Sequence, residues 1–202
     1  LEYSFVNEMG HRLSSAEEFQ EFIPCHYSGV GQRGKKVRVD GYEIDEADGS
    51  IRLMIADFSG SDELQTIIKT RAEGIFSQLA AFIDESISGR IWSADERKLS
   101  QVRELSRYLE VNGSSQDEHS NNISRYRLYL FTDKVLSDRV KDVQSGDIGG
   151  IPVEYHIWDI SRLYSVSQSP LGAEELVIDF NALVKGGLPC LHASSADDYD
   201  GY

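Results

Sequence analysis

The chain has 202 residues, of which 40% are hydrophobic and 27% charged, and its formal net charge is −14. This length is enough for one domain with a full hydrophobic core. The charge excludes a non-specific nucleic-acid binder that uses its whole surface, because such binding comes mostly from cations on phosphates. A local basic groove is still compatible with it. No apolar run approaches the roughly 20 residues of a membrane span and no signal peptide opens the chain, so we expect a cytoplasmic protein with no membrane contact.

The two ends suggest a piece of a longer protein. The chain begins at Leu1 without an initiator Met, and residues 193–202 form an acidic segment that contains Gly and Ser. We expect residues 1–192 to form a single α/β domain, the N-terminal domain of the longer protein. Residues 193–202 would then be a linker toward a missing C-terminal region. The expected protein partners are the rest of its own polypeptide and a second copy in a homodimer.

Residues 1–22 have a helical pattern, since apolar residues recur there at three- and four-residue intervals. We expect Gly10 to interrupt this helix, Ser14 or Ser15 to cap a second one, and Pro24 to end it. Residues 29–34 then spell G-x-G-x-x-G. A dinucleotide site needs a strand before that motif and a helix after it, and here the order is reversed. We therefore interpret the motif as a flexible loop.

The same loop is the most basic part of the acidic chain, with cations at Arg33, Lys35, Lys36 and Arg38. Such a run is either solvated or in contact with phosphate. If the protein contacts nucleic acid at all, we expect the contact through the segment Arg33–Arg38.

Residues 37–59 predict two strands joined by a tight turn, because Asp48-Gly49 is a strong hairpin signal. The residues expected to alternate between faces are Val37 and Val39 against Arg38, Asp40 and Tyr42 on the first arm, and Ile51, Leu53, Ile55 and Asp57 together on one face of the second. A carboxylate near the end of each strand, Asp40 and Asp57, is the most chemically suggestive pattern in the sequence. Both are either functional ligands or ordinary surface and turn carboxylates.

A long helix is expected after the hairpin, capped within Ser59–Ser61. Lys69 and Arg71 interrupt its apolar stripe, so they either point back toward the strand ends or are exposed. The further expected elements are a helix from about Ser93, a strand at 125–132, a helix at 134–143, a turn at 146–150, a strand at 151–159, a helix at 161–167, a strand at 176–180 and a turn at 186–190. This alternation predicts an α/β fold, a mixed β-sheet flanked by helices.

The two cysteines, Cys25 and Cys190, suggest no disulfide framework. Each has a histidine nearby, His26 and His192, so the four side chains could supply zinc ligands. The spacing matches no familiar zinc module, and two buried thiols with two ordinary histidines is the favoured interpretation.

Three blocks carry a family resemblance: Val39–Asp45 with Met54–Phe58, then Ile151–Tyr164, then Gly187–Leu191. They resemble the N-terminal region of the bacterial abortive-infection phage-resistance (AIPR) family. The resemblance implies a role in antiviral defence and a larger core that follows this domain.

The hairpin is also similar to the core of restriction-endonuclease-like folds of the Mrr-like, PD-(D/E)xK type. That resemblance implies a nuclease in which an Asp on one strand and an acid on the next bind Mg²⁺, with a nearby Lys that supplies positive charge. Asp40 matches the first acid. Ile55-Ala56-Asp57 stands where acid-x-Lys is expected, so this sequence departs from the pattern at two positions.

Two interpretations of this departure stay open. In one, Asp40 and Asp57 are the metal ligands, Lys69 or Arg71 supplies the positive charge, and the protein is an active Mg²⁺-dependent nuclease. In the other, the nuclease-like site is degenerate and the domain serves recognition, regulation or dimerisation. We favour the second, because two changed positions require two compensations. A third hypothesis, a protein-interaction domain unrelated to nucleases, rests on the acidity and on 10 Tyr, 8 Phe and 2 Trp.

Overall fold

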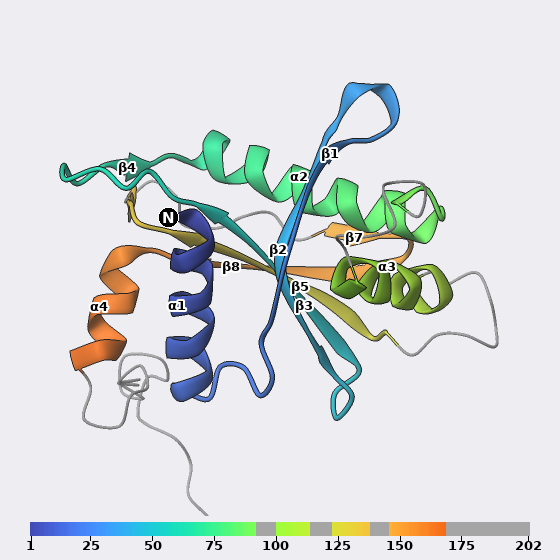
Figure 1. The fold of residues 1–202 in the computed structure, drawn as a ribbon, viewed down its shortest axis with the longest axis horizontal. Coiled ribbons are helices and arrows are strands. Elements are labelled where there is room, and N and C mark those ends of the chain that lie inside the picture. The colour runs from blue at the N-terminus through green and yellow to red at the C-terminus, as the bar shows by residue number, and fades with distance from the viewer. Residues whose placement is uncertain (92–99, 114–122, 138–145, 169–202) are drawn as a thin grey trace, which may run out of the picture.

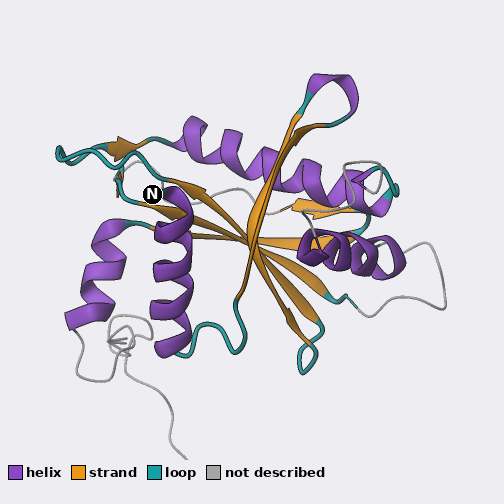
Figure 2. Cartoon of the chain, in the orientation of Figure 1, coloured by secondary structure: helices purple, strands orange, loops and turns teal. Residues whose placement is uncertain are grey.

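The computed structural model describes residues 1–91, 100–113, 123–137 and 146–168. In this part of the chain a six-stranded mixed sheet lies between two pairs of helices (Figures 1 and 2). The strands of the sheet, in spatial order, are β1 (Ile23–Val30), β2 (Lys36–Asp45), β3 (Ser50–Asp57), β5 (Arg125–Thr132), β8 (Ile151–Trp158) and β7 (Gly146–Ile148). The helices are α1 (Glu2–Ser15), α2 (Lys69–Ile87), α3 (Ser100–Asn112) and α4 (Ile160–Gln168). The predicted α/β architecture is confirmed.

The strands run in two patterns. β1, β2 and β3 form an antiparallel meander, whereas β3, β5 and β8 are parallel to one another and β7 is antiparallel to β8. The carboxyl ends of three parallel strands therefore meet at one edge, which is the place where open α/β sheets commonly bind ligands. Near this edge a second, two-stranded parallel sheet joins β4 (Thr66–Ile67) to β6 (Val135–Leu136).

Each face of the sheet has its own apolar core. On the face covered by α2 and α3, called here the α2 face, Ile51, Leu53 and Ile55 of β3 pack with α2, as their predicted alternation requires. On the face covered by α1 and α4, the α1 face, Met54 and Ala56 of β3 pack with α1. The two cores fix which side of the sheet every β3 side chain must face.

The prediction that Tyr42 shares a face with Asp40 is wrong. Tyr42 belongs to the core of the α2 face, together with Val37 and Val39. The β1–β2 pairing loses its regular register between Pro24 and Tyr27, beside Asp40, so simple alternation along β2 ends there.

The N-terminal region contains one helix, not two. α1 runs from Glu2 to Ser15 without interruption at Gly10. The ring of Phe22 fills the space that a Cβ at Gly10 would need, so this position favours glycine. Residues 23–30, expected as the end of a helix and a loop, form the edge strand β1. Pro24 is tolerated in β1 because an edge strand has one side without ladder hydrogen bonds.

The start of the long helix also differs from the prediction. α2 begins at Lys69, after β4, and residues of Ser59–Ser61 do not cap it. Leu64 and Ile68, which precede α2, are 72% and 58% exposed. The amides of Ser59 and Gly60 instead donate to the carboxylate of Asp133, beyond the end of β5. A contact distant in sequence thus replaces the expected local cap.

The C-terminal half follows the prediction in part: the strand β7 (Gly146–Ile148) forms where a turn at 146–150 was expected, because it pairs with β8. β5, β8 and α4 are confirmed at 125–132, 151–158 and 160–168. Where a helix over 134–143 was expected, β6 forms first, and 138–145 lie outside the described residues, as do the predicted helix start at Ser93, the strand at 176–180 and the turn at 186–190. Among the described helices, none has the length and apolar character needed to cross a membrane.

Candidate functional site

Asp40 lies where β2 and β3 separate. The residue pairs of the β2–β3 ladder extend only from Asp45–Ser50 to Gly41–Met54. Beyond that point the Asp40 side chain forms the contact between the two strands, because its Oδ2 accepts the backbone N–H of Ala56 at 2.9 Å. The carboxylate therefore satisfies a buried amide that the diverging strand leaves without a backbone partner.

Two further side chains hold the same carboxylate. His26 Nδ1 lies 2.7 Å from Oδ1, and Arg38 Nη2 lies 2.8 Å from Oδ2. Arg38 also forms an ion pair at 2.7 Å with Glu2 of α1. The Asp40 side chain is only 3% exposed, and a buried charge needs a partner. Arg38, on the α1 face, is the cation that balances it.

The His26–Asp40 contact predicts a pH dependence of stability. The hydrogen bond to Asp40 raises the pKa of His26 above its usual value of 6.5. The stabilising contribution is therefore complete below the unfolded-state pKa and is lost as the pH rises through the higher folded-state pKa. Because the His26 side chain is 55% exposed, solvent limits this contribution to about 1 kcal/mol or less.

Urea unfolding of the chain and of His26→Gln, at several values between about pH 5 and pH 8, measures this contribution. We expect the chain to be more stable than the variant at low pH, and the difference to shrink as the pH rises. A difference that is constant over this range would contradict the proposed proton linkage.

Asp57 ends β3 and is held by two cations. Arg71 of α2 donates from Nη2 to Oδ1 at 2.8 Å, and Lys134, just beyond β5, donates from Nζ to Oδ2 at 2.8 Å. Burial alone would raise the pKa of Asp57, but these hydrogen bonds lower it below its usual value. Asp57 is in phase with the core residues of the α2 face, so it lies on the opposite side of the sheet from the partners of Asp40.

The structure therefore does not bring the predicted site residues into one group. Asp57 is joined by Arg71, one of the two cations considered, and by Lys134, which was not predicted. Lys69 forms its ion pair at 3.8 Å with Glu73, one turn along the exposed side of α2. Within the described ranges, no three His, Cys, Asp or Glu side chains are grouped so that they could hold a metal ion. This donor set does not fit a Mg²⁺ site shared by Asp40 and Asp57.

The prediction missed two partners of the candidate acids, Lys134 and His26. Lys134 follows the strand that pairs in parallel with β3, and parallel neighbours end at the same edge of a sheet. His26 lies beside Cys25, where it was considered only as a zinc ligand. Burial raises the pKa of the Cys25 thiol to about 12, which opposes the thiolate that zinc requires. The other two residues of that zinc hypothesis, Cys190 and His192, lie outside the described residues.

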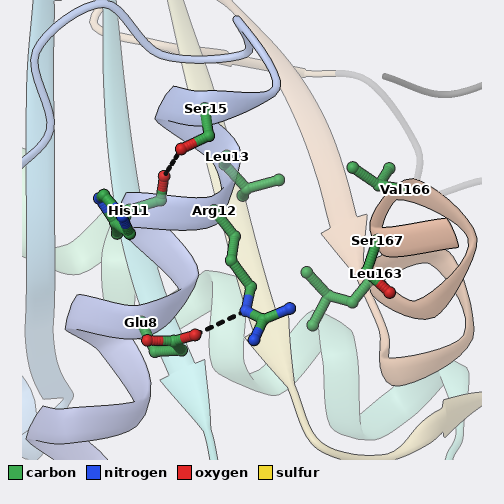
Figure 3. A pocket seen from close by; sticks show the side chains of 8 residues that line it. All are labelled: Glu8, His11, Arg12, Leu13, Ser15, Leu163, Val166 and Ser167. Atoms are coloured by element: carbon green, nitrogen blue, oxygen red, sulfur yellow. Dashed lines mark hydrogen bonds and ion pairs between the residues drawn. The ribbon is translucent and has the colours of Figure 1, made fainter. Parts of the chain in front are cut away.

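The hollows on the α1 face include the following two. One, with a volume of about 350 Å³, lies between α1 and α4, with Leu13, Leu163 and Val166 as apolar walls and the Glu8–Arg12 ion pair at its rim (Figure 3). The other, of about 190 Å³, is lined by Glu2, Tyr3, Val6, His26 and Asp40. Asp57 lines neither of these two hollows.

The comparisons with known proteins give a match to a family model. No curated protein and no solved structure matches the chain. A family model described as "Abortive infection phage resistance protein N-terminal domain" matches residues 5–165, which include all four described helices in whole or in part and the whole six-stranded sheet. Because the match covers most of the chain, the protein belongs to the family of abortive infection phage resistance proteins and contains their N-terminal domain.

Proposed function

We propose that this domain is a nuclease-like module that does not cleave nucleic acid and serves recognition, regulation or dimerisation within a phage-resistance protein. The observation that carries the proposal is the engagement of both carboxylates. Asp40 is tied to His26, Arg38 and the amide of Ala56, whereas Asp57 is tied to Arg71 and Lys134. In each carboxylate both oxygens already have protein partners.

Metal-dependent cleavage needs the opposite arrangement. Mg²⁺ requires oxygen ligands in near-ideal octahedral geometry at about 2.0–2.1 Å, and it is slow to exchange its waters for poorly placed ligands. For Asp40 and Asp57 to bind one metal ion, Asp40 would have to break its buried contacts and move to the opposite face of the sheet. The pairing of Asp57 with two cations also neutralises the charge that would attract the metal.

The order of the elements supports kinship with nucleases without requiring activity. The helix, hairpin, long helix and further strand that the restriction-endonuclease-like resemblance implies occur in that order as α1, β2–β3, α2 and β5, with β1, β4 and α3 inserted among them. The module would then retain the nuclease-like fold without metal-dependent cleavage. The interaction-domain hypothesis has less support, since Tyr3 and Tyr164 are the only described aromatic residues among the large exposed apolar side chains.

One contact favours the second candidate function, an active nuclease with a relocated lysine. Lys134 Nζ lies 2.8 Å from Asp57, so a lysine does reach the second acid, from the end of β5 and not from β3 itself. In that case Asp57 and Lys134 would be the pair on which cleavage depends.

Cleavage assays with Mg²⁺ and with Mn²⁺ on DNA and RNA distinguish the two candidates. We expect no metal-dependent cleavage by the chain above the background of Asp57→Asn and Lys134→Met. Glu154→Gln, a change at a partly exposed carboxylate remote from Asp57, is the matched control. Cleavage that Asp57→Asn and Lys134→Met abolish and Glu154→Gln retains would overturn the proposal in favour of the active enzyme.

A further inference from the structure

The β1–β2 hairpin ends in a tip that projects past α2, away from the body of the domain (Figure 1). The tip, residues 30–36, contains the short helical turn Gln32–Gly34, and its residues Gln32–Lys36 are all exposed. Val30 at its base is 73% exposed as well. This tip includes most of the basic segment singled out in the sequence.

Three exposed cations lie on the tip. Arg33, Lys35 and Lys36 form no ion pair with any described residue, whereas Arg38, the fourth cation of the predicted patch, is withdrawn to Asp40 and Glu2. The described cations that pair with carboxylates include Arg12, Arg38, Arg52, Lys69, Arg71, Arg90, Arg125, Arg127 and Lys134. Among the described residues, the tip therefore gathers three exposed cations without an ion pair, in a chain of net charge −14.

The tip is also held in one arrangement before any partner binds. Gly31 donates its N–H to the carbonyl of Lys35 at 2.8 Å, which closes the turn. Glu85 of α2 accepts the N–H of Gln32 at 2.8 Å and is itself paired with Arg90. A Cβ at Gly31 would lie 2.7 Å from Glu85 Oε1, so glycine permits this close approach. A pre-ordered tip loses less conformational freedom on binding than a flexible loop would.

We propose that the β1–β2 tip binds the phosphate backbone of nucleic acid through Arg33, Lys35 and Lys36. The planar guanidinium of Arg33 suits two phosphate oxygens, and the lysines add point charges beside it. The proposal deepens the proposed function and rests on it, because it names the partner of the recognition role. The proposed binding mode predicts that the tip contacts only a few phosphates, since the negatively charged remainder of the protein repels the rest of the nucleic-acid strand.

The shape of the tip favours a linear polyanion over a lipid surface. A narrow projecting hairpin can contact a strand or enter a groove while the acidic body stays at a distance. A flat anionic bilayer would bring that body close to many headgroups at once, and the repulsion would grow with the area of contact. Two carboxylates of α2 interact with the charge of Lys35: burial raises the pKa of Asp84, which Lys35 opposes, and the hydrogen bond from Arg90 lowers the pKa of Glu85, to which Lys35 also contributes.

Fluorescence anisotropy of the full chain with a labelled duplex of about 20 base pairs, with EDTA present, tests the proposal at several salt concentrations between about 50 and 200 mM. We expect the logarithm of the affinity to fall linearly with the logarithm of salt concentration, by about 0.9 per phosphate contact. The triple variant Arg33→Gln/Lys35→Gln/Lys36→Gln should bind at least about tenfold more weakly at low salt and lose most of that slope.

Arg107→Gln is the matched control, because Arg107 is an exposed cation on α3 that forms no ion pair with a described residue. It should leave both the affinity and the salt slope nearly unchanged. An equal loss in Arg107→Gln, full binding by the triple variant, or binding to phosphatidylserine vesicles but not to the duplex would each overturn the proposal. Because EDTA excludes metal-dependent cleavage, a negative result here leaves the proposal of lost cleavage intact.

Discussion

Replacing Arg52 with methionine is expected to lower the free energy of unfolding by about 3–5 kcal/mol, because it leaves uncompensated charge inside the protein. Arg52 of β3 bridges two carboxylates of β2, reaching Glu43 from Nη1 and Asp45 from Nη2 at 2.9 Å. The Glu43 side chain is only 2% exposed. Methionine preserves the apolar stem but supplies no cation, so both acids would stay buried without their partner. Urea unfolding monitored by circular dichroism measures the loss.

Arg125→Met is the matched control for this variant. Arg125 is also an arginine on a sheet strand paired with a carboxylate, but it and Glu154 are each 41% exposed. Exposed pairs of this kind contribute about 0–1 kcal/mol, so the control should be nearly as stable as the unchanged chain. Similar losses in the two variants would mean that burial of the Arg52 bridge does not determine its contribution.

Replacing Asp40 with alanine is expected to cost about 2–4 kcal/mol, because several buried groups lose their partner at once. The N–H of Ala56 would have no acceptor, and Arg38 would retain only Glu2. His26 would lose its hydrogen bond as well. The same urea titration measures this loss, and the circular dichroism spectrum in water shows whether the variant still folds.

Asp40→Asn separates the geometric role of this side chain from its charge. An asparagine keeps one oxygen that can accept the N–H of Ala56, so it should lose less stability than alanine does. If both variants were as stable as the unchanged chain, the contacts of Asp40 would be easy to break. Such a result would restore Asp40 as a candidate metal ligand.

The parts of the fold that local sequence specifies were predictable. Asp48-Gly49 predicted the β2–β3 hairpin; its loop comprises residues 46–49, and Gly49 has a positive φ of 68°. β5 is largely buried on both faces and β8 only partly so, and the apolar residues on both faces of each identified them as strands of the sheet.

The parts that depend on distant contacts were not predictable. β1 is rich in residues that disfavour strands, including Pro24 and Gly29, and it forms because β2 offers a partner. The segment Ser59–Asp62 has the composition of a helix start, but Asp133 binds its amides instead. In both places tertiary pairing overrides the local preference.

The candidate site shows the same limit. Asp57 was correctly placed in phase with Ile55, but its partner Lys134 is 77 positions further along the chain. The direction of Asp40 depends on the irregular register of β1 beside it, which no alternation of apolar and polar residues indicates. The sequence therefore identified two of the acids of interest, but not which groups each would meet.

The Asp133 carboxylate, which accepts from Ser59 and Gly60, has a consequence for how this protein folds. The meander of β1, β2 and β3 joins near neighbours, so its loop-closure entropy is small. The contact of Asp133 spans 74 positions, so it forms only after β5 has docked beside β3. The carboxyl edge of the sheet is thus completed late, and a nascent chain acquires its hairpin tip before it acquires the surroundings of Asp57.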